Sequence, residues 1–105
     1  MSINVEISNM EIKDLDLISN NLNTDFDDFW NYNIFKSELE NGNSKYLVAK
    51  IGDKIVGFAG IIPILNEADI SNIVVHKDFR NKKIGSYLLQ NLINLASSLN
   101  IEIIN

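Results

Sequence analysis

The stretch from Ala68 to Leu99 changes its hydrophobic period once, at a basic loop. Its first part, Ala68 to His76, is apolar and rich in β-branched residues, which is typical of a buried strand. Its last part, from about Ile84 to Leu99, repeats leucine and isoleucine at the three- and four-residue spacing of an amphipathic helix. The first turn of such a helix leaves backbone N–H groups without intrahelical partners, and the helix dipole favours negative charge there. The stretch therefore predicts a place where an anion can bind.

The loop between this strand and this helix concentrates positive charge in a chain whose formal net charge is -5. Four of the nine basic residues fall within seven positions: Lys77, Arg80, Lys82 and Lys83. Gly85 follows, and a residue without a side chain lets the backbone come close to a ligand. We expect phosphate oxygens to be bound by the loop that consists of Arg80, Asn81, Lys82, Lys83, Ile84, Gly85 and Ser86. The alternative is a tight turn at Gly85 with solvated lysines before an ordinary helix.

The periodicity of the whole chain predicts a mixed α/β fold. Alternating and β-branched runs predict strands at 3–8, 46–51, 54–64, 68–76 and 101–104. Helical spacing predicts helices at 10–21, in a run that ends near Gly42, and at 84–99. Ser8 or Asn9 can cap the first helix, and Gly52-Asp53 is a turn typical of a hairpin between the second and third strands. We expect strand 68–76 to be central in the sheet.

The composition of the chain limits the classes of function that it can have. A length of 105 residues with 46% hydrophobic content predicts one compact domain, residues 1–105. No cysteine and only one histidine are present, so we expect no metal. No apolar run approaches the roughly 20 residues of a membrane span, and the amino terminus lacks the features of a signal peptide, so we expect a cytoplasmic protein without a membrane partner. The negative net charge argues against nucleic acid as a partner.

Residues 67–89 resemble motif A of the GCN5-related N-acetyltransferases (GNAT). The pattern Asn-Ile-x-Val-x-x-x-Phe/Tyr-Arg/Gln-x-x-Gly-x-Gly is matched by Asn72, Ile73, Val75, Phe79, Arg80 and Gly85. Within the family, the chain is most similar to the ribosomal-protein alanine N-acetyltransferases, and Trp30 and Phe35 resemble a Trp-x4-Phe feature of that subfamily. The chain departs from the pattern at Lys83, where the family has the first glycine of its loop. That backbone position must then tolerate a Cβ, and the lysine can supply a charge to phosphate.

The resemblance implies a GNAT fold, a mixed α+β sheet, with acetyl-coenzyme A as the acetyl donor. It implies that the backbone of Ile73, Val74 and Val75 pairs with the pantetheine arm, and that the loop up to Ser86 binds the pyrophosphate. The implied acceptor is the α-amino group of a peptide or protein, for which the N-terminal alanine of ribosomal protein S18 is a candidate.

The chain offers no residue that we assign as catalytic. In the subfamily that the chain resembles, the base is a glutamate and the acid a tyrosine, on segments that would follow Asn105. Glu67 and Asp69 have same-face spacing with Ile73 and are candidate bases through water, although solvated acids are the commoner case. We expect Tyr87 to be a packing residue and His76 to be a surface residue.

The segment around residues 25–35 is rich in aromatics and acids. Its aromatics can shape an acceptor groove or can pack under a helix; they are Phe26, Phe29, Trp30, Tyr32 and Phe35. Its acids can attract a cationic peptide terminus or can be simply solvated; they are Asp25, Asp27 and Asp28.

The sequence stops as a strand begins, at Ile101–Asn105, so we expect the GNAT fold to lack its C-terminal strands and helix. An unpaired edge there can associate with another chain, which predicts a homodimer. Two other functions stay open. One is a catalytically silent module that binds acetyl-coenzyme A or a partner, and the other is an α/β domain that binds no nucleotide.

Overall fold

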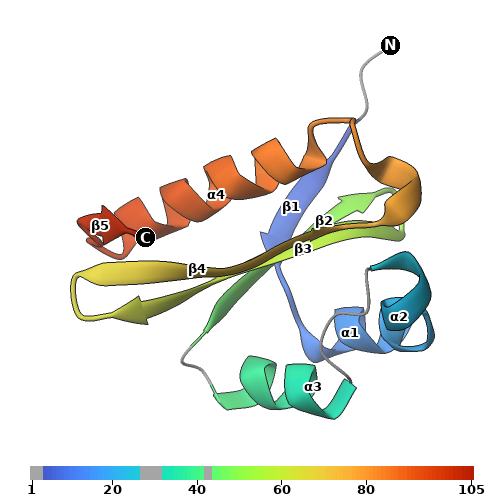
Figure 1. Ribbon diagram of the computed structural model, residues 1–105, viewed down its shortest axis with the longest axis horizontal. Coiled ribbons are helices and arrows are strands. Elements are labelled where there is room, and N and C mark those ends of the chain that lie inside the picture. The colour runs from blue at the N-terminus through green and yellow to red at the C-terminus, as the bar shows by residue number, and fades with distance from the viewer. Residues whose placement is uncertain (1–3, 27–31, 42–43) are drawn as a thin grey trace.

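A five-stranded sheet organises the described part of the chain, with its strands in the spatial order β1-β2-β3-β4-β5 (Figure 1). The computed structural model describes residues 4–26, 32–41 and 44–105. The strands are β1 (Glu6–Asn9), β2 (Lys45–Ile51), β3 (Lys54–Ile64), β4 (Glu67–Val75) and β5 (Ile103–Ile104). Neighbours among the first four strands are antiparallel, whereas β5 runs parallel to β4. The mixed α/β architecture predicted from the sequence is confirmed.

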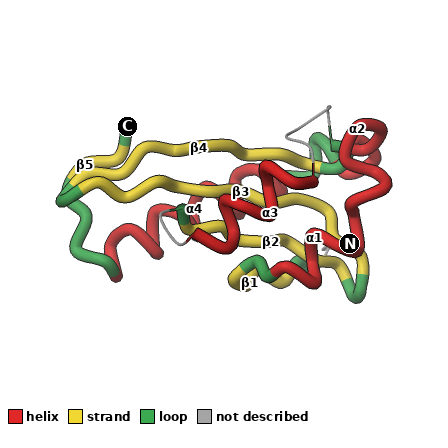
Figure 2. The backbone as a smooth tube through the Cα atoms, turned by 90° about the horizontal axis from the view of Figure 1, so that it is seen from below, coloured by secondary structure: helices red, strands yellow, loops and turns green. Residues whose placement is uncertain are grey.

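Helices cover both faces of the sheet. One face carries α4 (Ile84–Ser98), and the other carries α1 (Ile12–Ile18), α2 (Leu22–Asp25) and α3 (Tyr32–Asn41). Figure 2 looks from below, from the side of α1 and α3. Two 3-10 turns complete the described elements, η1 (Ser19–Asn21) and η2 (Lys77–Phe79). The second of these lies between β4 and α4, where the sequence places its basic loop.

The two central strands are apolar along both faces because each face packs against a helix layer. Phe58 of β3 and Val48 of β2 are fully buried toward α1 and α3, whereas Val56 of β3 is fully buried toward α4. Gly57 allows α4 to approach β3 closely. A Cβ at Gly57 would lie 2.9 Å from the carbonyl oxygen of Val74 and 3.1 Å from Cδ1 of Leu88.

The predicted hairpin between β2 and β3 is confirmed, with Gly52 in a left-handed turn at φ 61°. The predicted helix 10–21 is instead divided into α1 and η1, and α2 follows from Leu22. Its start is also corrected: Ser8 and Asn9 belong to β1, and Asp14 accepts a hydrogen bond from the Glu11 N–H at 2.9 Å. Gly42, the predicted helix stop, lies outside the described residues.

The expectation that β4 is central is correct only at its start. It pairs with β3 from Glu67 to Val75, but with β5 only at Glu67 and Ala68. The contact with the chain after β5 ends where the Ile70 N–H donates to the carbonyl of Asn105 at 3.1 Å. From residue 72 to residue 75, the outer side of β4 is a sheet edge within the described structure.

None of the helices in residues 4–26, 32–41 and 44–105 has the length and apolar character that crossing a membrane requires.

Candidate functional site

The N-terminus of α4 is not capped by the protein. Its N-cap residue, Lys83, makes no side-chain cap, and the first intrahelical bond runs from the Tyr87 N–H to the Lys83 carbonyl at 3.1 Å. The N–H groups of Ile84, Gly85 and Ser86 therefore have no partner among the described residues. Three free amides at the positive end of a 15-residue helix form the arrangement that binds phosphate groups.

Gly85 is not required by the packing or the backbone of the chain. Its φ is not positive, and a Cβ there would lie 3.8 Å from Cγ2 of Val75 and 3.9 Å from Cγ2 of Ile73, which are ordinary contact distances. The missing side chain instead leaves open the space between the first turn of α4 and the outer part of β4. A ligand that touches both elements can use that space.

The loop before α4 reaches its position through two residues in the left-handed region. Asn81 has φ 64° and Lys83 has φ 65°, so Lys83 adopts the backbone conformation that suits the glycine of the family pattern. The Arg80 Nε donates to the Val75 carbonyl at 3.4 Å, which ties the loop to the end of β4. Lys82 and Lys83 are exposed, and neither has a carboxylate partner in the described parts of the chain.

The edge of β4 offers backbone groups from alternate residues. The His76 N–H donates to the Val56 carbonyl at 2.8 Å, and antiparallel alternation then directs Val74 toward β3 and the backbone groups of Ile73 and Val75 outward. Of the three predicted pantetheine contacts, Ile73 and Val75 are thus placed to pair with an added strand. Val74 is not, and its side chain packs toward the other helix layer.

A β-bulge at Ser71 determines which side chains of β4 face α4. Gly60 pairs with Asn72 and Ile61 pairs with Ile70, so Ser71 is the extra residue. Its hydroxyl lies 3.2 Å from that of Tyr46 and accepts from the Asn72 amide at 3.1 Å. A bulge shifts the alternation of a strand by one residue.

The sequence predicts that the candidate bases Glu67 and Asp69 lie on the same face of β4 as Ile73, but the bulge places them on the opposite face. Ala68 packs with the α4 cluster before the bulge, and Ile73 lies beside Gly85 of α4 after it. Glu67 and Asp69 alternate with Ala68, so both face away from α4, and Asp69 accepts from the Asn105 amide at 2.9 Å. The same-face prediction was wrong because period-two counting assumes an unbroken ladder.

His76 is also corrected, since it is 5% exposed rather than on the surface. Its Nε2 lies 3.4 Å from Oδ2 of Asp25, and Lys77 Nζ lies 3.6 Å from Oδ1 of the same residue. Asp25 is therefore engaged with two side chains from the end of β4 and the start of η2, rather than open to a peptide or simply solvated. Asp27 and Asp28 lie outside the described residues.

The described aromatics of the 25–35 segment pack in the core on the side of α1 and α3, and Phe26 also lines a hollow of about 190 Å³ with Asp25 and His76. Phe26 and Phe35 are buried against Phe58, with ring centroids 5.4 and 5.1 Å away. The hydroxyl of Tyr32 donates to Oδ1 of Asp16 at 2.6 Å, and this bond raises the pKa of Tyr32 above its ordinary value. Phe29 and Trp30 lie outside the described residues.

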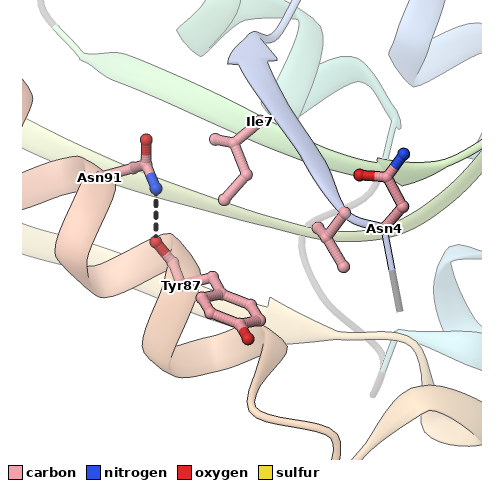
Figure 3. Close-up of a pocket in the computed structure, with 5 residues that line it drawn as sticks. Asn4, Ile7, Tyr87 and Asn91 are labelled. Atoms are coloured by element: carbon pink, nitrogen blue, oxygen red, sulfur yellow. Dashed lines mark hydrogen bonds between the residues drawn. The ribbon is translucent and has the colours of Figure 1, made fainter. Parts of the chain in front are cut away.

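Tyr87, expected to pack, is 47% exposed. It lines a hollow of about 270 Å³ between α4 and the segment that leads into β1, together with Asn4, Val5, Ile7 and Asn91. Figure 3 shows Tyr87 beside Asn91, whose amide donates to the Tyr87 carbonyl at 2.8 Å. The hollow lies on the side of α4 away from Gly85, because two helical residues turn about 200°.

Comparison with known proteins shows the family to which the chain belongs. Residues 10–105 match the family model described as the acetyltransferase (GNAT) family, and the chain belongs to that family. A curated protein of Bacillus subtilis (strain 168), named putative ribosomal protein bS18-alanine N-acetyltransferase, is 27% identical over 97 residues, which are 91% of this chain and 64% of that protein.

Solved structures show the same fold. The ribosomal-protein-S18-alanine N-acetyltransferase of Escherichia coli superposes with a TM-score of 0.81 at 24% identity, covering 93% of this chain and 63% of that one. The PaiA N-acetyltransferase of Thermoplasma acidophilum, solved in complex with coenzyme A, gives 0.76 at 18% identity, covering 93% and 75%. The chain thus spans a little under two thirds of the length of the Bacillus subtilis and Escherichia coli proteins.

Proposed function

We propose that this chain binds acetyl-coenzyme A and acts as an N-acetyltransferase on the α-amino group of a peptide or protein. The observation that carries the proposal is the uncapped first turn of α4 beside the unpaired edge of β4. Phosphate oxygens would accept from the amides of Ile84, Gly85 and Ser86, and the pantetheine amides would pair with Ile73 and Val75. The coenzyme A complex of the Thermoplasma relative supports this donor.

The basic loop adds charge to that cradle. Arg80, Lys82 and Lys83 lie within four positions of one another and precede the helix directly. Cationic side chains beside backbone N–H groups strengthen the binding of a diphosphate, and exposed lysines do so in a salt-dependent way. Asn81 would contribute through its left-handed turn, which directs the chain into the helix.

In the proposed reaction, a neutral amine attacks the carbonyl of the thioester. The N–C bond forms and the C–S bond breaks, the amine gives up a proton to a base, and the coenzyme thiolate takes one from an acid. We propose the N-terminal alanine of ribosomal protein S18 as the acceptor, because the name of the Bacillus subtilis relative specifies an alanine of ribosomal protein bS18.

A coenzyme-binding module without turnover is the second candidate. It is favoured by the position of Glu67 and Asp69, which face away from the side of β4 that meets α4. Turnover of an S18-derived peptide separates the two functions, since coenzyme binding without acetylated product supports the module alone.

The test of coenzyme binding uses Gly85. Gly85→Ala adds a Cβ at ordinary contact distances in a helix, so the fold should be as stable or more stable by up to about 1 kcal/mol. Isothermal titration with coenzyme A should show about tenfold weaker binding by Gly85→Ala and none by Gly85→Glu. Asn94→Glu, an exposed change on the same helix, is the control for added charge. Unchanged affinity in both Gly85 variants contradicts the proposal.

We further propose that two copies associate through the outer edge of β5, where Ile103 and Ile104 are 47% and 37% exposed. An apolar strand without a neighbour on that side in the described structure can pair with a second copy. Size-exclusion chromatography should show a dimer that Ile103→Lys converts to monomer. A monomer at every concentration contradicts the proposed dimer. A cytoplasmic location of the protein stays a prediction.

A further inference from the structure

His76, the only histidine of the chain, lies where β4 ends and is buried. Its ring is edge-on to Phe26, which directly follows α2, at 5.3 Å and 83°, and to Phe79 of η2, at 5.4 Å and 85°. An imidazole in such apolar surroundings is costly unless its nitrogens have partners. Packing alone therefore does not explain why a histidine is buried at this position.

Both ring nitrogens have a partner, and the two partners belong to different elements. Nδ1 accepts from the backbone N–H of Asp78 at 3.1 Å, and Nε2 lies 3.4 Å from Oδ2 of Asp25 in α2. Nδ1 can accept only while it carries no hydrogen, so the hydrogen of the neutral ring belongs on Nε2, facing the carboxylate. His76 thus joins α2 to the turn that leaves the sheet.

The bond at Nδ1 is the N-cap of η2. Together with the bond from the Phe79 N–H to the His76 carbonyl, at 2.9 Å, it closes the turn that directs the chain away from β4. Arg80 follows at once and is tied back to Val75. Only residues 80–83 remain before α4 begins, so the orientation of its free amides relative to the β4 edge depends on how η2 is closed.

We propose that His76 is a positioning residue for coenzyme binding and that it acts through Nδ1. The proposal rests on the proposed function. The two nitrogens have separable effects: the cap at Nδ1 sets the affinity for the diphosphate, whereas the contact of Nε2 with Asp25 holds the ring in place and contributes to stability. Neither nitrogen touches the reacting atoms.

Three substitutions at His76 separate these effects. His76→Asn puts its side-chain oxygen at the branch position of Nδ1, where asparagine is a good cap, but it is too short to reach Asp25. His76→Gln extends toward Asp25 and lacks an acceptor at the capping position, and His76→Leu lacks both. Asp25→Asn is the fourth variant, because it removes the carboxylate and leaves the cap.

Coenzyme A is titrated calorimetrically into each variant, and the free energy of unfolding is measured by denaturant. We expect His76→Asn and Asp25→Asn to bind within about threefold of the unchanged chain although both are less stable. His76→Gln and His76→Leu should bind about five- to tenfold more weakly, which corresponds to the usual effect of losing a cap.

Two outcomes overturn the inference alone: equal loss of affinity in the Asn and Leu variants, and affinities that follow stability across all four variants. Absence of coenzyme A binding by the unchanged chain overturns the proposed function and the inference together. The two failures are therefore distinguishable in one series of measurements.

Discussion

Lys83 occupies a left-handed backbone position at φ 65° and ψ 16°, where a side chain costs of order 1 kcal/mol. Lys83→Gly should therefore raise the free energy of unfolding by about 0.5–1 kcal/mol, because glycine adopts this region without strain. Denaturant unfolding measures the change. Lys82→Gly, at an exposed neighbour without a positive φ, is the matched control and should lower stability or leave it unchanged. A loss of stability in Lys83→Gly as large as in the control would contradict the strain.

Asp14 is the buried acid of α1, and its Oδ1 forms an ion pair with Lys50 Nζ of β2 at 2.8 Å. Removing one partner leaves a charge with reduced solvation, and the partly exposed Lys50 limits the penalty. Asp14→Asn should therefore lower the free energy of unfolding by about 2–3 kcal/mol in denaturant titrations. Lys13→Ala breaks the exposed pair with Glu11, the N-cap residue of α1, and should leave stability nearly unchanged. Similar losses in both variants would refute the role of burial.

The composition of the loop and its resemblance to a family pattern predict an anion site at residues 80–86, which stays a prediction, and the uncapped first turn of α4 is what such a site needs. The roles of Asp14 and His76 could not be predicted in the same way. Each has a partner more than 30 positions away in the sequence, Lys50 for Asp14 and Asp25 for His76, so no local pattern marks either residue. Burial of a polar side chain becomes visible only when distant elements are brought together.

At the scale of elements, the hydroxyl of Tyr32 at the start of α3 donates to Asp16 of α1. This hydrogen bond, and to a lesser extent burial, raises the pKa of Tyr32 in the folded chain. A raised folded pKa means that stability from the bond is present below the ordinary value of about 10 and is lost as pH rises through the folded value. Asp16→Asn should return the pKa toward the ordinary value.

Ultraviolet titration of tyrosinate measures this change, with Tyr32→Phe as the variant that identifies the signal. Tyr32→Phe should also remove the part of the pH dependence of stability that belongs to this bond. An identical tyrosinate titration in the unchanged chain and in Asp16→Asn would show that the bond is absent in solution.

The strands and helices with the clearest period were predicted well, because β2, β3 and α4 bury the faces that their apolar residues define. Prediction failed where tertiary contacts override local pattern. The 10–21 run became two short elements, α1 and η1, and β4 gained an extra residue at Ser71. A bulge has no composition of its own that separates it from an ordinary strand residue.

At the scale of the whole molecule, the structure predicts a gradient of amide protection. The interior of β3 has a strand on each side and a helix layer on each face, so its amides should exchange most slowly. In the monomer, the two-residue strand β5 and the outward N–H groups of Ile73 and Val75 should exchange fast. Hydrogen exchange followed by NMR measures this, and coenzyme A should slow Ile73 and Val75 but not β5. Slow exchange at Ile73 before coenzyme is added would contradict an open edge.

Because β4 contains one extra residue, Ser71, the alternation of its side chains between the two faces is reversed from the first half of the strand to the second. Before residue 71 the even positions Ala68 and Ile70 meet the long helix, and after it the odd positions Ile73 and Val75 do. In a regular ladder that kept residue 71 and had no bulge, the inner and outer groups of the second half would be exchanged, so that Val74 would present its amide to the donor and Ile73 would turn its amide toward β3. The bulge in β4, as much as the composition of the strand, therefore decides which amides a thioester-bearing arm can meet.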